Sequence, residues 1–262
     1  MRKLTHRLAV IALALSLTVF AAVGVVQAAT TEYFGEDLGL GETTRLSSWP
    51  NAEAAEAEFL SRLTGVGTED FEGFAQGNST PLAIDFGVAG TATLYGNGYI
   101  NSLPAATDPS FGRYPTSGDK YWEASSSFWI EFSQPIAAIG FYATDIGDFN
   151  GQVVVELENG GTRSYTIDNT VGGAGGSVLF YGIIEDDPAL QFTKVTFGNT
   201  APGVDYFGFD DFTIGTLTQV VTPVGGTAQP IDRLALLAPW IALGAAMIAG
   251  AAVHMRRRLP QS

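Results

Sequence analysis

The sequence lacks cysteine, and between its two ends it also lacks histidine. None of the 262 residues is cysteine, and the two histidines are His6 and His254. A disulfide framework, a cysteine metal site and a thiol nucleophile are therefore excluded. The middle of the chain has neither the commonest general base nor the commonest metal ligand, which excludes Ser-His-Asp and Cys-His catalysis there.

Basic residues are scarce in the middle of the chain. Seven of the 13 lysines and arginines lie in or beside the two ends, so residues 29–231 keep six basic against 26 acidic side chains, a net charge of −20. A surface this acidic repels nucleic acid and anionic headgroups. It attracts cations, and calcium, which prefers oxygen ligands, is the first candidate.

Two apolar segments bracket this acidic middle. Residues 1–28 have a basic start, an apolar run and a small-residue site at Ala28, which predicts a cleaved signal peptide; an uncleaved N-terminal anchor is the alternative. Residues 234–253 carry no charge and are followed by Arg256, Arg257 and Arg258. This pattern predicts a transmembrane anchor over 234–255 with a basic cytoplasmic tail over 256–262. We therefore expect an exported protein held at the cell surface or on the periplasmic side.

The middle of the chain has the pattern of an all-β protein. Residues 29–68 are interpreted as a leader with one short helix over 51–63, and residues 216–233 as a stalk. Short β-rich runs separated by Gly, Asn, Asp and Pro, with no helical pattern between them, predict an antiparallel, jelly-roll-like β-sandwich over 69–215. The candidate strands are 69–75, 82–87, 91–96, 126–133, 136–144, 152–158, 162–168, 177–184, 191–198 and 205–214. The long connection 97–125 shows no clear strand.

Aromatic residues in the connection 97–125 are the candidate ligand-binding residues. They are Tyr99, Tyr114, Tyr121 and Trp122. A rigid ring beside hydrogen-bonding groups can stack on a sugar ring. The alternative is that these rings cover one end of the sandwich core, and burial of Tyr114, Tyr121 and Trp122 would remove the main support for sugar binding there.

Six acidic residues are the candidate calcium ligands: Asp70, Glu72, Asp210, Asp211, Asp145 and Asp148. The first four converge if the first and last strands of the sandwich lie side by side, and a change of side-chain parity between Phe209 and Phe212 predicts a β-bulge at 210–211. Asp145 and Asp148 lie on a glycine-punctuated loop without EF-hand spacing. The alternative for all six is an acid that faces solvent or bonds to the backbone of a turn.

Several segments, taken in order, resemble a known group of proteins. They are Thr68-Glu-Asp-Phe-Glu-Gly-Phe74, residues 128–148, the Glu158-Asn-Gly-Gly161 turn, residues 192–197 and residues 205–215. The chain resembles exported bacterial β-sandwich proteins that carry PEP-CTERM-type or other interchangeable C-terminal sorting and anchoring segments. The resemblance implies a surface-associated protein, often linked to extracellular matrix or polysaccharide. Where that pattern has Pro-Glu-Pro, this chain reads Gln229-Pro-Ile-Asp-Arg233, which favours a plain, uncleaved anchor.

These observations predict a non-enzymatic, membrane-anchored surface protein that binds polysaccharide and calcium and does not bind nucleic acid. A surface glycosidase or lyase that uses paired carboxylates is one alternative. A structural surface-layer or matrix component is another. An enzyme is expected to show a cleft with two carboxylates, whereas a binding protein is expected to show aromatic rings on an open face. No catalytic residue is singled out.

Overall fold

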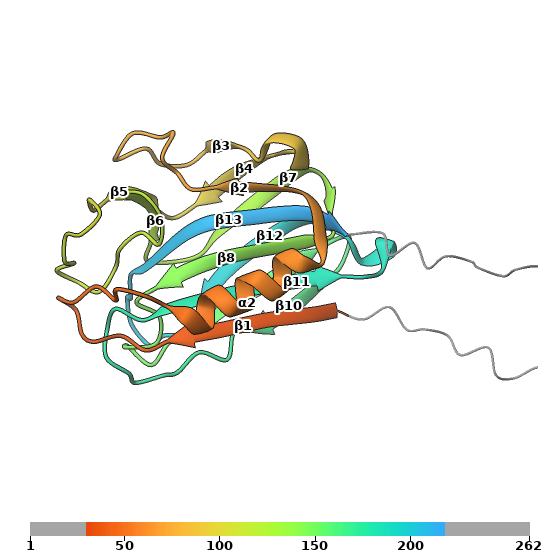
Figure 1. Cartoon of the computed structure of the whole chain (residues 1–262). Helices are drawn as coiled ribbons and strands as arrows, with labels where there is room; N and C mark the ends of the chain where they lie inside the picture. Colours follow the sequence, from red (N-terminus) through yellow and green to blue (C-terminus); the bar gives the residue numbers. More distant parts are fainter. Residues whose placement is uncertain (1–29, 218–262) are drawn as a thin grey trace, which may run out of the picture. The chain divides into compact units, whose positions relative to one another are not determined.

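Alternation of buried and exposed side chains builds two antiparallel sheets that pack face to face (Figure 1). The computed structural model describes residues 30–217. The first sheet has the strand order β1 (Thr30–Asp37), β11 (Val178–Glu185), β8 (Ala138–Thr144), β13 (Phe207–Leu217), β6 (Lys120–Ala124) and β5 (Tyr99–Ser102), with β2 (Leu63–Glu69) also paired to β13. The second has the order β10 (Thr162–Thr166), β9 (Val153–Glu158), β12 (Phe192–Asn199), β7 (Phe128–Ile136), β4 (Thr91–Gly96) and β3 (Leu82–Asp85). The predicted β-sandwich is confirmed, and its jelly-roll connectivity stays a prediction.

Phenylalanine rings fill the space between the two sheets. Phe128 of β7 stacks on Phe197 of β12 with ring centres 4.5 Å apart, and Phe141 of the opposite sheet meets Phe197 edge-on at 5.2 Å. Phe209 and Phe212 of β13 pack on the same group. Burying each ring contributes about 1.5–3 kcal/mol, so this aromatic centre holds the two sheets together.

A helix forms a second, smaller core on the outer face of the first sheet. Helix α2 (Pro50–Ser61) lies across β1, β11 and β8 (Figure 1) and buries Phe59 against Phe180. Asp37, at the end of β1, accepts hydrogen bonds from the backbone N–H groups of Asn51 and Ala52, both at 3.0 Å. The free N–H groups at the start of the helix therefore bond to a neighbouring strand.

Two expectations about the chain's organisation are corrected by the strand pairing. Residues 30–68 are not a separate leader: β1 pairs with β11 along its whole length, and β2 pairs with β13. The expected strand at 69–75 is wrong because Phe71 adopts a left-handed backbone with φ of 59° and ends the extended run. The connection 97–125 contains two strands, β5 and β6, which pair with each other.

One turn and one bulge follow the sequence pattern closely. Strands β9 and β10 form an antiparallel hairpin around Asn159, Gly160 and Gly161, with Gly160 at a φ of 93°. The register of β13 against β8 shifts between Asp210 and Thr213, so a bulge lies where the phenylalanine pattern placed it.

Several predicted segments lie outside the described residues. They are the signal peptide 1–28, residues 218–233 of the stalk, the transmembrane anchor 234–255 and the basic tail 256–262. Within residues 30–217, no helix combines the length and the apolar character that a membrane crossing needs.

Candidate functional site

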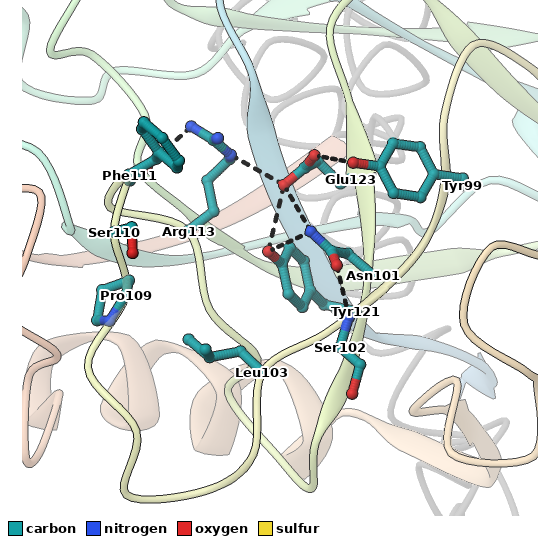
Figure 2. A pocket seen from close by; sticks show the side chains of 10 residues that line it. All are labelled: Tyr99, Asn101, Ser102, Leu103, Pro109, Ser110, Phe111, Arg113, Tyr121 and Glu123. Carbon is teal, nitrogen blue, oxygen red and sulfur yellow. Dashed lines mark hydrogen bonds and ion pairs between the residues drawn. The ribbon is translucent and has the colours of Figure 1, made fainter.

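Two neighbouring cavities meet at Arg113 in the loops at one end of the sandwich. The first, here the tyrosine pocket, has a volume of about 330 Å³ and is lined by Tyr99, Asn101, Ser102, Leu103, Pro109, Ser110, Phe111, Arg113, Tyr121 and Glu123 (Figure 2). The second, here the acidic pocket, has a volume of about 560 Å³ and is lined by Glu42, Ser110, Phe111, Arg113, Asp145, Phe149, Val204, Asp205 and Tyr206. Because Ser110, Phe111 and Arg113 line both, the two pockets form one divided cleft.

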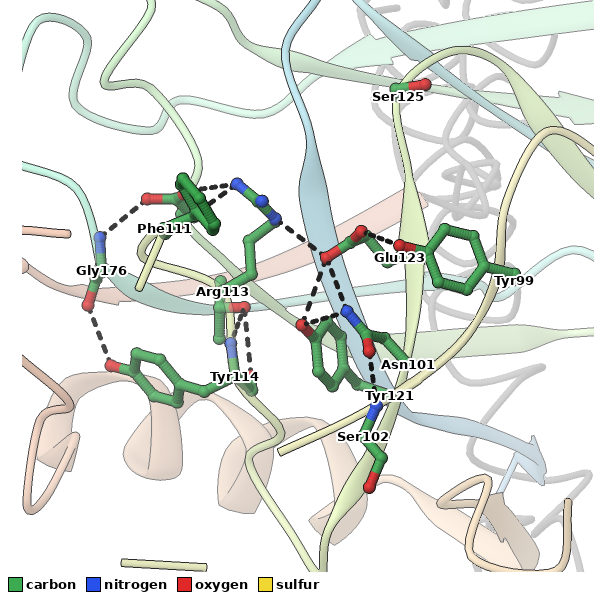
Figure 3. Close-up of polar contacts among 12 residues, drawn as sticks. Tyr99, Asn101, Ser102, Phe111, Arg113, Tyr114, Tyr121, Glu123, Ser125 and Gly176 are labelled. Carbon is green, nitrogen blue, oxygen red and sulfur yellow. Dashed lines mark hydrogen bonds and ion pairs between the residues drawn. The ribbon is translucent and has the colours of Figure 1, made fainter. Parts of the chain in front are cut away.

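Glu123 on β6 is the centre of the tyrosine pocket. Its carboxylate accepts hydrogen bonds from Tyr99 Oη (2.5 Å), Arg113 Nε (3.0 Å), Asn101 Nδ2 (3.1 Å) and Tyr121 Oη (3.2 Å) (Figures 2 and 3). Burial alone would raise the pKa of Glu123, but these hydrogen bonds and the guanidinium charge outweigh it and lower the pKa. The carboxylate is therefore ionised and fully engaged.

The same hydrogen bond changes the pKa of Tyr99. The hydrogen bond to Glu123, together with burial and the carboxylate charge, raises the pKa of Tyr99 to about 12. Tyr99 is a neutral donor at physiological pH, and its ring is partly exposed at the mouth of the pocket.

Arg113 joins the two pockets through both charge and ring contacts. Its Nε bonds to Glu123, and its Nη1 bonds to Asp145 Oδ2 at 3.3 Å and to the carbonyl of Phe111 at 2.8 Å. The guanidinium carbon lies 5.6 Å from the ring centre of Phe111 and 5.4 Å from that of Tyr206. Arg113 therefore holds two rings in place on the cleft wall by cation–π attraction.

The acidic pocket carries the exposed rings of the cleft. Phe111 is 65% exposed, and Phe149 and Tyr206 are also exposed. Exposed apolar rings beside polar groups are typical of a binding surface.

Three acidic side chains, Glu42, Asp145 and Asp205, line the acidic pocket, and a fourth, Asp148, lies close to Glu42 and Asp145. We name these four residues, which come from three loops, the loop acids. One carboxylate oxygen from each of Glu42, Asp145 and Asp148 lies within 4.8 Å of the other two. Oxygens this close repel one another unless a cation or a proton intervenes. These three residues form a group that can hold a metal ion.

Asp145 is the most constrained of the loop acids. It has a left-handed backbone with φ of 65°, and its Oδ1 accepts the N–H of Gly176 at 2.8 Å. Burial raises its pKa to about 7, and the charges of Asp148 and Glu42 act in the same direction, against the lowering effects of the Gly176 N–H and Arg113. The fold holds this carboxyl where its ionised form is poorly stabilised.

Asp205 differs from its neighbours because one of its oxygens has no partner. It lies just before β13 and is only 3% exposed, yet its Oδ2 makes no hydrogen bond within residues 30–217. Burial raises its pKa to about 7, and the charge of Asp148 and then that of Glu42 add to this rise. A buried carboxylate oxygen without a donor costs about 1–3 kcal/mol or more, so some compensation is expected.

Glycines let the loops close around this group. A Cβ at Gly112, which has a φ of 72°, would lie 1.9 Å from Asp145 Oδ1, and a Cβ at Gly175 would lie 2.5 Å from Glu42 Oε1. Only glycine allows the backbone to approach these carboxylates so closely.

The other predicted calcium ligands, Asp70, Glu72, Asp210 and Asp211, are here named the strand acids. The pairing of β2 with β13 places Asp70 and Glu72 close to Asp211. Burial raises the pKa of Asp211, and the negative charges of Asp70 and Glu72 help to raise it. Asp210 Oδ2 accepts the N–H groups of Thr116 (2.8 Å) and Ser117 (3.1 Å).

The remaining strand acids are also engaged in hydrogen bonds. Asp211 accepts the hydroxyls of Thr116 and Ser117. Glu72 Oε1 accepts the N–H groups of Asp119 (2.7 Å) and Lys120 (2.6 Å), and Asp70 accepts the N–H of Glu72. Within residues 30–217 no strand acid belongs to the group of close carboxylate oxygens. Asp210, Asp211 and Glu72 therefore hold the segment 116–120, which leads from Arg113 into β6.

The four predicted aromatic residues have different places. Tyr114 and Trp122 are 0% exposed and Tyr121 is 3% exposed, so they cover the end of the core, and the sugar-stacking role expected for them loses its support. Tyr114 donates to the carbonyl of Gly176 at 2.9 Å and packs in the smaller core (Figure 3). Tyr99 and Tyr121 line the tyrosine pocket, but of these two only Tyr99 has an exposed ring.

Sequence reasoning missed several residues of the cleft, among them Glu42, Phe111, Arg113, Glu123, Phe149, Asp205 and Tyr206. Glu42 stood in the supposed leader, and Asp205 and Tyr206 stood inside the expected strand 205–214. The available signal was Arg113, which is one of only six basic residues in the acidic middle and lies among aromatic neighbours.

Comparisons with known proteins give only distant likenesses. No family model and no curated protein matches this chain. Among solved structures, it is similar to the K2 cleaved adhesin domain of Lys-gingipain (13% identity, 58% of this chain and 99% of that one, TM-score 0.39). It is also similar to the C-terminal family 22 carbohydrate-binding module of Clostridium thermocellum Xyn10B (15% identity, 58% and 92%, TM-score 0.36) and to a family 29 carbohydrate-binding module (15% identity, 72% and 90%, TM-score 0.26). Likenesses at this level assign no function to this chain.

Proposed function

We propose that this chain is a non-enzymatic polysaccharide-binding protein whose ligand occupies the divided cleft. The observation that carries the proposal is the acidic pocket, in which the exposed rings of Phe111, Phe149 and Tyr206 stand beside hydrogen-bonding side chains. Ring faces pack against the C–H groups of a sugar, and the polar groups around them bond its hydroxyls. The tyrosine pocket continues this surface on the other side of Arg113, and the ring of Tyr99 lies at its rim.

The charge of the cleft indicates which class of polysaccharide it can bind. Five carboxylates, those of Glu123 and the loop acids, surround the single guanidinium of Arg113. An acidic polymer would meet repulsion here unless a cation intervened. We therefore propose a neutral polysaccharide as the ligand and include calcium in the proposal, as the cation for which the loop acids offer oxygen ligands.

The exported, membrane-anchored location is part of the same proposal. Its support is the sequence of residues 1–28 and 234–262, with a basic residue cluster after the apolar run. A surface tether presents the acidic sandwich to extracellular polymers.

The rival proposal is a glycosidase or lyase that uses Glu123 and Asp145, because Arg113 contacts both. Catalysis needs one carboxyl to protonate the substrate and the other to attack it or to activate water. Both carboxyls are at least 95% buried, and both already accept hydrogen bonds from groups of the protein. This geometry favours binding over hydrolysis.

The test is a glycan array probed with residues 29–225, with and without calcium. The proposal predicts binding that Phe111→Ala and Tyr206→Ala each weaken about tenfold, the equivalent of one lost stacking contact. Val88→Ala is the matched control, since Val88 is exposed but lines neither pocket. Release of reducing sugar would favour the enzyme. Failure to bind any glycan would favour the structural surface-layer role.

A further inference from the structure

The loop acids form a group with an unmet requirement for positive charge. Three of them bring carboxylate oxygens within 4.8 Å of one another, and the fourth, Asp205, contributes a buried oxygen with no hydrogen-bond partner within residues 30–217. Among the four loop acids, Arg113 forms an ion pair with Asp145 through its Nη1. Its Nε bonds to Glu123, which is not a loop acid. The available positive charge is therefore too small for the group.

Three of the loop acids have the oxygen spacing of a cation site, and the fourth, Asp205, lines the same pocket as Glu42 and Asp145. The ligands come from the loop after β1 (Glu42), the loop between β8 and β9 (Asp145 and Asp148) and the loop before β13 (Asp205). Four carboxylates supply at least four oxygens, whereas calcium takes six to eight in flexible geometry. Glu42, Asp145 and Asp205 also line the acidic pocket, so the coordination positions that remain face that cavity.

We propose that Asp205 joins Glu42, Asp145 and Asp148 as ligands of one calcium ion, and that the ion's open positions take hydroxyl groups of the bound polysaccharide. The first part deepens the calcium binding of the proposed function by making Asp205 a ligand, and the second part rests on the polysaccharide binding proposed there. The ion gives the unpartnered oxygen of Asp205 a ligand bond and ties three loops together. Sugar hydroxyls are hard oxygen donors that replace water on calcium without a change of charge.

Calcium titration of the full chain by isothermal calorimetry tests the ion site. We expect one site per chain, and we expect Asp205→Asn to weaken it at least about tenfold, because affinity follows the number of charged ligands. Asp148→Asn is the second variant and is expected to act in the same way, so the test does not depend on the folding of one variant. Asp70→Asn removes the same charge from an exposed strand acid and is expected to bind calcium as the wild type does. No heat at millimolar calcium, or unchanged affinity in both loop variants, would overturn the site.

The coupling to sugar is tested on a printed glycan array probed with the full chain in calcium and in chelator. Retention only in calcium, lost in Asp205→Asn and kept in Asp70→Asn, is the expected result. Equal retention in calcium and chelator would overturn the coupling while the proposed function stands. Calcium binding without retention on any glycan would overturn both the coupling and the proposed function, and the ion site would stand.

Discussion

The strand acids and the loop acids are two groups of four carboxylates that differ in their surroundings. Each oxygen of Asp210 meets a backbone N–H, and Asp211 meets the hydroxyls of Thr116 and Ser117. In the loop acids, Asp205 keeps an oxygen with no partner within residues 30–217. The loop acids therefore differ from the strand acids in two ways: Glu42, Asp145 and Asp148 bring their oxygens close together, and Asp205 keeps an oxygen without a donor.

The strand acids stabilise the segment that leads into the cleft. They fix residues 116–120, and this segment continues into β6, where Glu123 anchors Arg113. Three of the loop acids, Glu42, Asp145 and Asp205, line the acidic pocket directly. Changes in the first group should act on stability, and changes in the second should act on ligands.

Replacing Asp210 should have the largest effect. Asp210→Ala leaves the N–H groups of Thr116 and Ser117 without their acceptor inside the protein, which should lower the free energy of unfolding by about 3 kcal/mol. Urea denaturation of the wild type and the variant measures the change. A stable Asp210→Ala protein that had lost calcium binding would reverse the roles assigned to the two groups.

Calcium itself should have the next largest effect. An ion that binds only the folded state at a hundred times its dissociation constant adds about 2.7 kcal/mol to the free energy of unfolding. We expect calcium to raise the melting temperature of the wild type and a chelator to return it. Magnesium at the same concentration is the control, because it demands a smaller octahedral site and should raise the melting temperature less.

Glu123→Gln should have an intermediate, pH-dependent effect. The pKa of Glu123 lies below its ordinary value of 4.5 in the folded protein, so the ionised side chain stabilises the fold above pH 4.5, and this contribution is lost as pH falls through the folded-state pKa. At pH 7 the variant should be less stable by about 1–2 kcal/mol, the size of a charged hydrogen-bond network.

The pH dependence of that difference is the sharper readout. The gap between the wild type and Glu123→Gln should close on acidification, as followed by thermal melts across a pH series. A gap that stayed constant, or widened, below pH 4.5 would show that Glu123 is not held as a carboxylate by Tyr99, Arg113 and Asn101.

Asp70→Asn should have the smallest effect. Its side chain is exposed and accepts only the local N–H of Glu72, which an asparagine oxygen also accepts. The free energy of unfolding should change by less than about 0.5 kcal/mol, as for most surface substitutions. A larger loss in urea denaturation would mean that the strand acids act as one charged unit.

Much of the fold could be predicted because one face of most strands is buried. The run 91–96 matches β4, and the bulge at 210–211 followed from phenylalanines that must all point into the core. Strand β6 was missed because its buried glutamate, Glu123, hides the usual alternation of polar and apolar residues. Strand β1 was missed because its side chains are mostly half-exposed at the edge of the sheet.

The candidate site was predicted in fragments. Asp145 and Asp148 stand close together in the sequence, so their loop was visible as a possible ligand source. Glu42 and Asp205 reach the same place only because the order of β1, β11, β8 and β13 in one sheet brings their loops to the same end. A single sequence does not reveal that order, and it does not reveal which carboxylates find backbone donors.

The central claim is that the loop acids bind a cation and the strand acids do not. Crystals of the protein soaked with terbium, a calcium substitute with strong anomalous scattering, test it directly. The account predicts one anomalous peak within ligand distance of Glu42, Asp145, Asp148 and Asp205. A peak among Asp70, Glu72, Asp210 and Asp211, or no peak at either group, would contradict it.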